Sequence, residues 1–271
     1  SSLALAELAP TQLVKPERAR LNDSNSTGRR RKEFWWQYAA DAKRLYAAIA
    51  DLDQVIAVTR VSSLVQPSRV SAAQVLSDSL TVVASDSPGL LGLLSSAVHG
   101  EWARKYASSL RTDIRYTPSA VFETFPLPDD WASLSTWGLA MESARNTVMS
   151  GRGLGLTAAY NLVKAPHVDD PDVQRLREAH VDLDSAVLAA YHWSDLEPGH
   201  GFFETEQGVR FTMDPLVTAE VLDRLLELNH ARYADEVAVG LHGKQAAGGE
   251  RATVKRAAKD GEGEGDAVLF E

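Results

Sequence analysis

Three serine-proline or aspartate-proline pairs constrain the fold of this chain more than any other feature of its sequence. Ser87-Pro88, Asp170-Pro171 and Asp214-Pro215 each stand directly before a run with apolar side chains at helical spacing. A serine or aspartate side chain accepts hydrogen bonds from the free N–H groups of a first helical turn, and proline fits the first helical position because that position needs no donor. The sequence therefore predicts helices that begin at these three prolines, the first of them over residues 88–108.

Two shorter runs have the composition of strands. "QVIAVTRVSS" (54–63) and "DSLTVVAS" (78–85) are rich in Val, Ile and Thr, and Pro67 between them argues against a continuous central strand there. A helix over 35–50 precedes them, and from residue 131 the pattern is helical. The predicted fold class is α+β, with a small mixed-sheet recognition domain followed by a mainly helical C-terminal domain.

Shifts in composition divide the chain into four expected parts. A polar and then basic stretch opens it, and a Gly-, Ala- and charge-rich stretch that predicts disorder closes it. The expected parts are a linker or exposed loop at 1–33, an α/β domain at 34–130, a helical domain at 131–242 and a disordered tail at 243–271.

The segment "RYTPSAVFETFPLP", residues 115–128, holds three prolines and three aromatic side chains beside a group of arginines. It does not fit an amphipathic helix, so the sequence predicts a strand or extended edge segment over 113–128. Its prolines restrict the backbone and lower the entropy cost of an extended conformation. Phe122 and Phe125 are expected to anchor the segment in the core, although stacking on a base is the functional alternative.

The composition excludes several classes of protein. The 271 residues contain no cysteine, which rules out disulfide scaffolds, thiolate metal sites and cysteine nucleophiles, and a reducing cytoplasm is the expected compartment. No apolar run approaches the roughly 20 residues of a membrane span, so no membrane partner is expected. The net charge of −9 argues against non-specific coating of nucleic acid. A local basic face stays possible, because charges are screened over about 8–10 Å.

A search for catalytic motifs finds none. The chain lacks a G-x-S-x-G elbow, a P-loop and an H-E-x-x-H motif, and "GRGLGL" (151–156) is interpreted as a turn before a helix. His180 and Asp184 stand one helical turn apart, but no third ligand is evident, so no metal site is expected. The chain alone is therefore not expected to be an enzyme.

A group of basic residues is the strongest candidate for a binding site. Arginine can grip phosphates or read guanine edges in the major groove, whereas the alternative is an ordinary solvated patch, and composition alone does not choose between them. The candidates are Arg60, Arg69, Arg104, Lys105, Arg111 and Arg115.

Several blocks occur in an order that resembles a known family. They are "FWWQYAADAKRLYAAIADLDQVIAVTRVS", "LLSSAVHGEWARKYASSLRTDIRYTPSAVFETFPLP", "GLGLTAAYNLV", "LREAHVDLDSAVLAAYHWSDL" and "GFFETEQGVRFTMDP…VLDRLLELNHARYADEV". Together they resemble the C-terminal part of large class I adenine-N6 DNA methyltransferases, the type IIG enzymes of restriction–modification and phage-defence systems. The resemblance covers roughly residues 34–240, and "YTP…FETFP" is its most specific block.

The resemblance implies a target-recognition domain with a helical appendage. In such enzymes a separate domain binds S-adenosylmethionine and flips the target adenine, while the recognition domain chooses the DNA sequence. That catalytic half carries an Asn- or Asp-Pro-Pro-aromatic motif, but none of the five asparagines of this chain precedes a proline. The first residue is serine, so a fragment, or a subunit that works with a separate methyltransferase, is expected. No cofactor is expected in this chain.

Two classes of function remain open from the sequence. The leading one is sequence-specific recognition of double-stranded DNA for an adenine-N6 methyltransferase domain or subunit. The alternative is a helical interaction subunit that docks a methyltransferase or another defence component without reading DNA itself.

Overall fold

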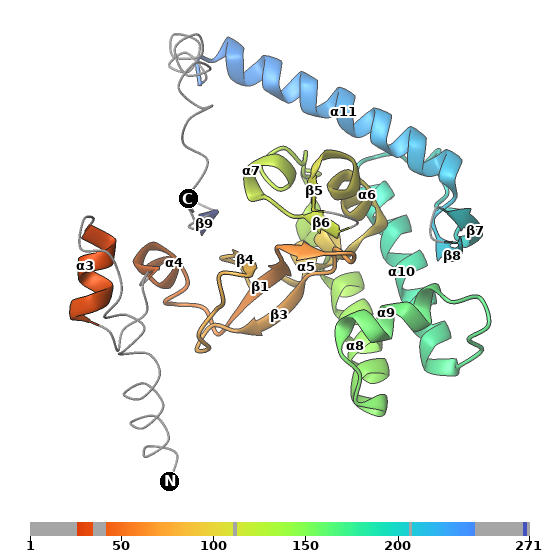
Figure 1. Ribbon diagram of the computed structural model, residues 1–271. Coiled ribbons are helices and arrows are strands. Elements are labelled where there is room, and N and C mark those ends of the chain that lie inside the picture. Colours follow the sequence, from red (N-terminus) through yellow and green to blue (C-terminus); the bar gives the residue numbers. More distant parts are fainter. Residues whose placement is uncertain (1–25, 35–41, 111–112, 206–207, 242–267, 270–271) are drawn as a thin grey trace. The chain divides into compact units, whose positions relative to one another are not determined.

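The computed structural model describes residues 26–34, 42–110, 113–205, 208–241 and 268–269, drawn as coloured ribbon in Figure 1. The chain forms two compact units, Ser1–Ala47 and Ala48–Glu271. Helix α3, Ser26–Glu33, lies in the first unit, and the prediction of a linker is wrong there because Arg, Lys and Glu are strong helix formers. Helix α4, Lys43–Ala48, is the described part of the helix predicted over 35–50.

Two small sheets lie in the second unit, and they confirm the predicted strands and the α+β class. The four-stranded sheet has the order β3-β1-β4-β9, and the three-stranded sheet has the order β2-β6-β5. Apart from the parallel β4–β9 pair, all the pairings in both sheets are antiparallel. The strands are β1 Gln54–Thr59, β2 Val61–Ser62, β3 Ser68–Ser71, β4 Leu80–Val83, β5 Ser108–Leu110, β6 Asp113–Arg115 and β9 Val268–Leu269.

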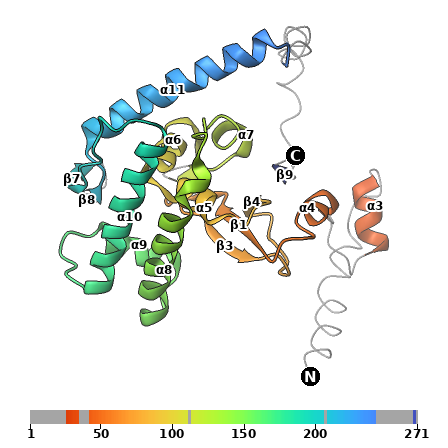
Figure 2. The same cartoon turned by 180° about the vertical axis from the view of Figure 1, so that it is seen from behind.

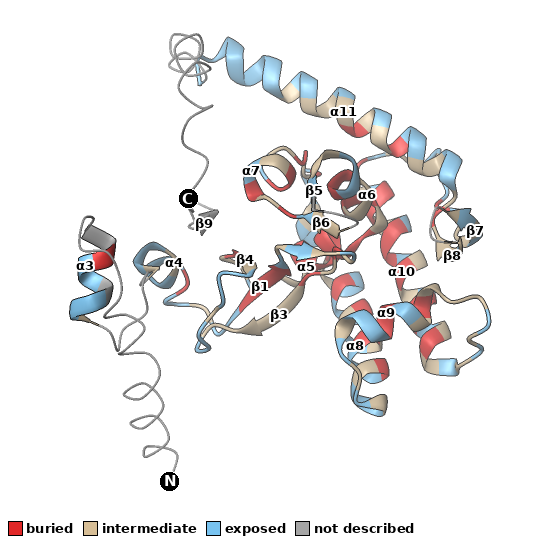
Figure 3. Ribbon diagram, viewed as in Figure 1, coloured by how far each residue is buried: buried red, intermediate tan, exposed pale blue. Residues whose placement is uncertain are grey.

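Helices surround the sheets and share one core with them. Buried side chains from β1, α5, α8 and α10 form a single cluster, and Figure 3 shows the buried residues concentrated in these elements. In Figure 2, α5, α8 and α10 lie side by side, in agreement with their contacts. The helices of this unit are α5 Pro88–Ser95, α6 Ala97–Tyr106, α7 Pro118–Val121, the 3₁₀ helix η2 Trp131–Leu134, α8 Ser135–Arg152, α9 Leu156–Lys164, α10 Pro171–Ala190 and α11 Pro215–Ala238. Residues on both sides of the domain boundary predicted between 130 and 131 belong to this core. Two separate domains with separate functions on either side of it therefore stay a prediction.

The three predicted helix starts are confirmed. The side chain of Ser87 accepts from the backbone N–H of Leu90, and Asp170 and Asp214 cap α10 and α11 in the same way. The helix predicted over 88–108 is wrong at Ser96, where the backbone is extended and α5 ends. The carboxylate of Asp184 accepts from Ala97 N at 2.7 Å, so α10 supplies a partner for the first turn of α6.

The proline-rich segment is only partly extended. β6 confirms a strand at its beginning, but Pro118 then opens the one-turn helix α7, so the prediction of an extended segment through residue 128 is wrong there. Pro118 occupies the first position of α7, as proline does in the three predicted helices. Phe122 N closes the turn by donating to Pro118 O. Phe122 and Phe125 are both buried, which confirms that they anchor the segment in the core.

A β-hairpin interrupts the region predicted to be helical. Strands β7, Gly201–Thr205, and β8, Gly208–Thr212, pair antiparallel directly before α11. The sequence predicts only helices here, yet aromatic and β-branched residues separated by a short turn are a hairpin signal. The predicted disordered tail at 243–271 lies outside the described residues except for β9.

Two buried histidines make the stability of the second unit depend on pH. The ring of His99 contacts Leu94 O at 2.8 Å and the Tyr116 hydroxyl at 3.1 Å, and His180 contacts the Tyr160 hydroxyl at 2.8 Å. Burial lowers the pKa of each histidine to about 4. Both rings therefore stay neutral in the folded protein at a pH where the unfolded chain already binds protons.

The free energy of unfolding is consequently expected to fall as the pH decreases from about 6.5 to about 4, because at these two histidines only the unfolded state takes up protons in that window. Each histidine contributes a slope of up to about 1.4 kcal/mol per pH unit. Denaturant unfolding at a series of pH values measures this slope. His180→Gln is expected to make it shallower, and a slope identical to that of the unmodified chain would contradict the assignment.

Candidate nucleic-acid interface

The three-stranded sheet presents an exposed arginine. Arg115, at the end of β6, stands opposite Val61 of β2 and Ser108 of β5, so these three side chains share one face of the sheet. All three are exposed. The Arg115 side chain makes no ion pair or hydrogen bond within the described part of the chain, which leaves its guanidinium available to a ligand.

Arg60 directly precedes Val61, the residue of β2 that pairs with Arg115. It connects β1 to β2, and its carbonyl accepts from Tyr116 N at 2.7 Å, directly after Arg115. Its guanidinium donates to the carbonyl of Asp78 at 3.0 Å, which uses one of five donors. The two arginines that the sequence analysis places 55 positions apart are thus brought to the same small sheet.

The end of α6 adds two further cations. Lys105 is exposed and stands three residues before Ser108 of β5, so it lies close to the same sheet. Arg104 pairs with Glu101 at 3.4 Å, about half of its side chain is exposed, and it lines a pocket described below. Positive side chains in a last helical turn are also stabilised by the helix dipole.

Arg69 lies in a different setting. It projects from β3 and forms a bidentate contact with Glu142 of α8, with Nε–Oε1 and Nε–Oε2 distances of 3.1 and 3.2 Å. The hydrogen bond to Glu142 raises the pKa of Arg69, and only 18% of its side chain is exposed. Its guanidinium thus joins β3 to α8, and a role in DNA binding would require this pair to open. Arg111 lies outside the described residues.

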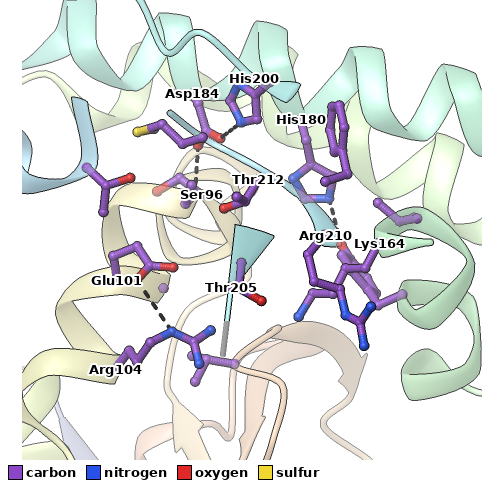
Figure 4. A pocket seen from close by; sticks show the side chains of 18 of the residues that line it. Ser96, Glu101, Arg104, Lys164, His180, Asp184, His200, Thr205, Arg210 and Thr212 are labelled. Carbon is purple, nitrogen blue, oxygen red and sulfur yellow. Dashed lines mark hydrogen bonds and ion pairs between the residues drawn. The ribbon is translucent and has the colours of Figure 1, made fainter. Parts of the chain in front are cut away.

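A pocket of about 430 Å³ lies beside α6 in the second unit (Figure 4). The junction of α5 and α6, helices α9 and α10, and the β7–β8 hairpin supply its walls. Lys164, Arg210, His180 and His200 line it together with Arg104. No sequence pattern predicts this site, because its walls come together only through tertiary packing, although the basic residue within "GVRFT" is a weak signal.

The two metal-ligand types that stand one helical turn apart in the sequence, His180 and Asp184, contact other side chains in the fold. His180 and Asp184 are both buried on α10, but His180 contacts Tyr160 and Asp184 contacts His200 at 2.9 Å. Among the described residues no three metal-ligating side chains gather into a group. None of the described helices is long and apolar enough to span a membrane.

Residues 9–129 match a protein family described as "MmeI, target recognition domain". This stretch of the chain is therefore similar to an MmeI-type target recognition domain. All six predicted basic residues fall inside this domain, as do both small sheets apart from β9. The pocket, in contrast, combines the target recognition domain with α9, α10 and the hairpin that follow it.

Two known proteins extend this finding. DNA methyltransferase A of Bacillus subtilis (strain 168) is 32% identical over 127 residues, which are 45% of this chain and 13% of that protein. The solved structure of the type IIL restriction–modification enzyme MmeI in complex with DNA matches with a TM-score of 0.53 and 19% identity, over 86% of this chain and 26% of that one. A match over 86% of this chain extends beyond residues 9–129 into the part of the chain that follows them. The chain spans only a minor part of the length of either protein.

Proposed function

We propose that this chain recognises a specific sequence in double-stranded DNA on behalf of an adenine-N6 methyltransferase of a restriction–modification system. The observation that carries the proposal is the match of residues 9–129 to the MmeI target recognition domain. The fold match to an enzyme solved in complex with DNA supports it.

The leading candidates for contact with the duplex are Arg60, Lys105 and Arg115. They lie around the three-stranded sheet, and the exposed guanidinium of Arg115 suits the major-groove edge of guanine or a backbone phosphate. Arg104, Arg69 and Arg111 stay predictions, with Arg69 the weakest because Glu142 occupies its guanidinium. With a net charge of −9 the chain cannot rely on overall attraction to DNA, so affinity must come from such local contacts.

Methyl transfer is proposed to reside outside these 271 residues. The Asn-Pro-Pro-aromatic motif does not occur in the chain. The similar stretch covers only 13% of DNA methyltransferase A of Bacillus subtilis, so most of that protein has no counterpart in the match. We infer that S-adenosylmethionine binds to a methyltransferase domain or subunit that acts together with this chain. Since such a pair meets DNA and the chain has no cysteine, the cytoplasm is the proposed compartment.

The alternative, a helical docking subunit that does not read DNA, receives less support from the packing. Helices α8 and α10 contribute to the same core cluster as β1, α5 and α6. The helical part therefore shares its core with the elements that carry the candidate DNA face. This packing favours one DNA-recognition unit over a separate docking subunit.

A binding selection tests the proposal. The purified chain is incubated with random duplexes at physiological salt, and bound duplexes are sequenced after several rounds. The expected result is enrichment of one short sequence family. Bound duplexes with the composition of the starting library, together with stable capture of a methyltransferase, would instead support the docking subunit.

A further inference from the structure

The pocket beside α6 has the size and the lining of a small-molecule site. Its volume of about 430 Å³ lies within the range of roughly 300–1,000 Å³ that ligand pockets occupy. Val65 and Val163, with Phe211 and Met213 of the hairpin region, supply apolar surface that suits a flat ring. Polar side chains stand at defined places on this apolar background, which is the usual arrangement of a site that orients its ligand.

Three buried polar atoms in the pocket wall have no hydrogen-bond partner. They are Gln66 Oε1, Ser95 Oγ and His200 Nδ1, and among the described residues only two further side-chain atoms of this kind occur, both elsewhere. Ser95 is 1% exposed and the His200 side chain 5%. Leaving such an atom unsatisfied costs about 1–3 kcal/mol, so three of them in one pocket indicate a partner that the protein itself does not supply.

His200 is held in a fixed orientation within this wall. Its Nε2 contacts the carboxylate of Asp184 at 2.9 Å, and Asp184 is fixed in turn by the Ala97 N–H. The ring also stacks on Phe211 with centroids 5.7 Å apart. Asp184 thus holds one ring nitrogen of His200 (Figure 4), and Nδ1 is the ring nitrogen without a partner.

Positive charge gathers on the other side of the pocket. Lys164 of α9 and Arg210 of β8 line it beside one another in Figure 4, and Arg104 of α6 lines it as well. Burial lowers the pKa of Lys164, and Arg104 and Arg210 add repulsion that Glu101 offsets only in part. Glu204 is exposed at the pocket, and Arg104 already pairs with Glu101. An anion between Lys164 and Arg210 would relieve this repulsion.

We propose that the pocket binds a small organic phosphate of mononucleotide size. Its phosphate would lie between Lys164 and Arg210, its ring against the apolar wall, and its polar edge at Ser95, His200 and Gln66. This site is separate from the exposed Arg115 face and does not depend on the proposed function. A bound molecule would contact α6, α9 and the β7–β8 hairpin at once. It would therefore stabilise the packing of the helical part on the target recognition domain.

Calorimetric titration of the whole chain with AMP, GMP, CMP, UMP and inorganic phosphate tests the site. At least one mononucleotide is expected to bind with a Kd below about 1 mM and more tightly than inorganic phosphate, because only the nucleotide reaches the buried polar atoms. The double variant Lys164→Ala/Arg210→Ala is expected to bind it at least about tenfold more weakly, since both charge-assisted contacts are lost. Arg175→Ala, an exposed arginine near the start of α10 that does not line the pocket, is the matched control and should bind as the unmodified chain does.

Several results would overturn the proposal. No heat and no thermal stabilisation from any mononucleotide at about 10 mM would do so, as would equal binding by the double variant. If the unmodified chain binds no nucleotide and the double variant loses affinity for duplex DNA, these two cations would be assigned to contacts with the DNA backbone instead. If the double variant does not fold by circular dichroism, Lys164→Gln and Arg210→Gln are tested singly with the same criteria. Loss of nucleotide binding with duplex binding intact separates this site from the proposed function.

Discussion

Gly138→Ala is expected to destabilise the second unit by about 3 kcal/mol, the upper end of typical overpacking costs. Gly138 lies on α8 where it crosses α5, and a Cβ atom there would stand 2.0 Å from the carbonyl oxygen of Pro88. That neighbour is backbone at the capped start of α5, so it cannot move aside as a flexible side chain would. The two helices would have to separate and open the core between them.

Gly151→Ala is the matched control on the same helix, because a Cβ at that position meets nothing within 4 Å. It is expected to be neutral or to stabilise by about 0.5 kcal/mol, since alanine favours a helix over glycine. Thermal unfolding compares the two, and for a unit of this size about 3 kcal/mol corresponds to a Tm lowered by roughly 6–12 °C. Equal Tm values for both variants would show that α5 and α8 do not cross as described.

Arg115→Ala is expected to weaken binding to the preferred duplex by about 1–3 kcal/mol, or roughly 5- to 150-fold. Arg115 is the exposed arginine of the three-stranded sheet, and its guanidinium has no partner among the described residues. If it reads a base edge, the variant also loses discrimination at one position of the recognised sequence. If it contacts a phosphate, affinity falls uniformly and the dependence on salt becomes shallower.

Arg175→Ala serves as the control for the loss of one positive charge. Its side chain is 70% exposed on α10 and, among the described residues, pairs with Asp172 one turn away. Fluorescence anisotropy at two salt concentrations compares both variants with the unmodified chain. Equal affinities for Arg115→Ala and Arg175→Ala would remove Arg115 from the interface.

The sequence predicts the helix starts well because their chemistry is local. A serine or aspartate side chain and the proline that follows it decide the first turn without help from the rest of the chain. The break at Ser96 depends in part on a distant residue, because the Asp184 carboxylate, 87 positions later, accepts from Ala97 N, although the Ser96 side chain itself also caps α6 by accepting from His99 N. The one-turn helix α7 and the β7–β8 hairpin, in contrast, carry local signals: Thr117-Pro118 precedes the helix, and aromatic and β-branched residues flank the short turn of the hairpin.

The candidate sites show the same contrast. The group of basic residues is visible in the sequence, but the structure separates Arg69 from it through a pairing with Glu142, 73 positions away. Lys164, Arg210 and His200 have no shared sequence signal, since helix α9, strand β8 and the loop before β7 bring them to one pocket. Residue types therefore indicate the chemistry, whereas long-range packing decides which side chains stay available for it.

If this chain chooses a DNA sequence, its affinities for two duplexes of the same composition must differ. The chain is titrated with the duplex recovered by selection and with a shuffled duplex of the same composition, at one physiological salt concentration. A target recognition domain is expected to bind the selected duplex at least about a thousandfold more tightly. Equal affinities for the two duplexes would contradict the account.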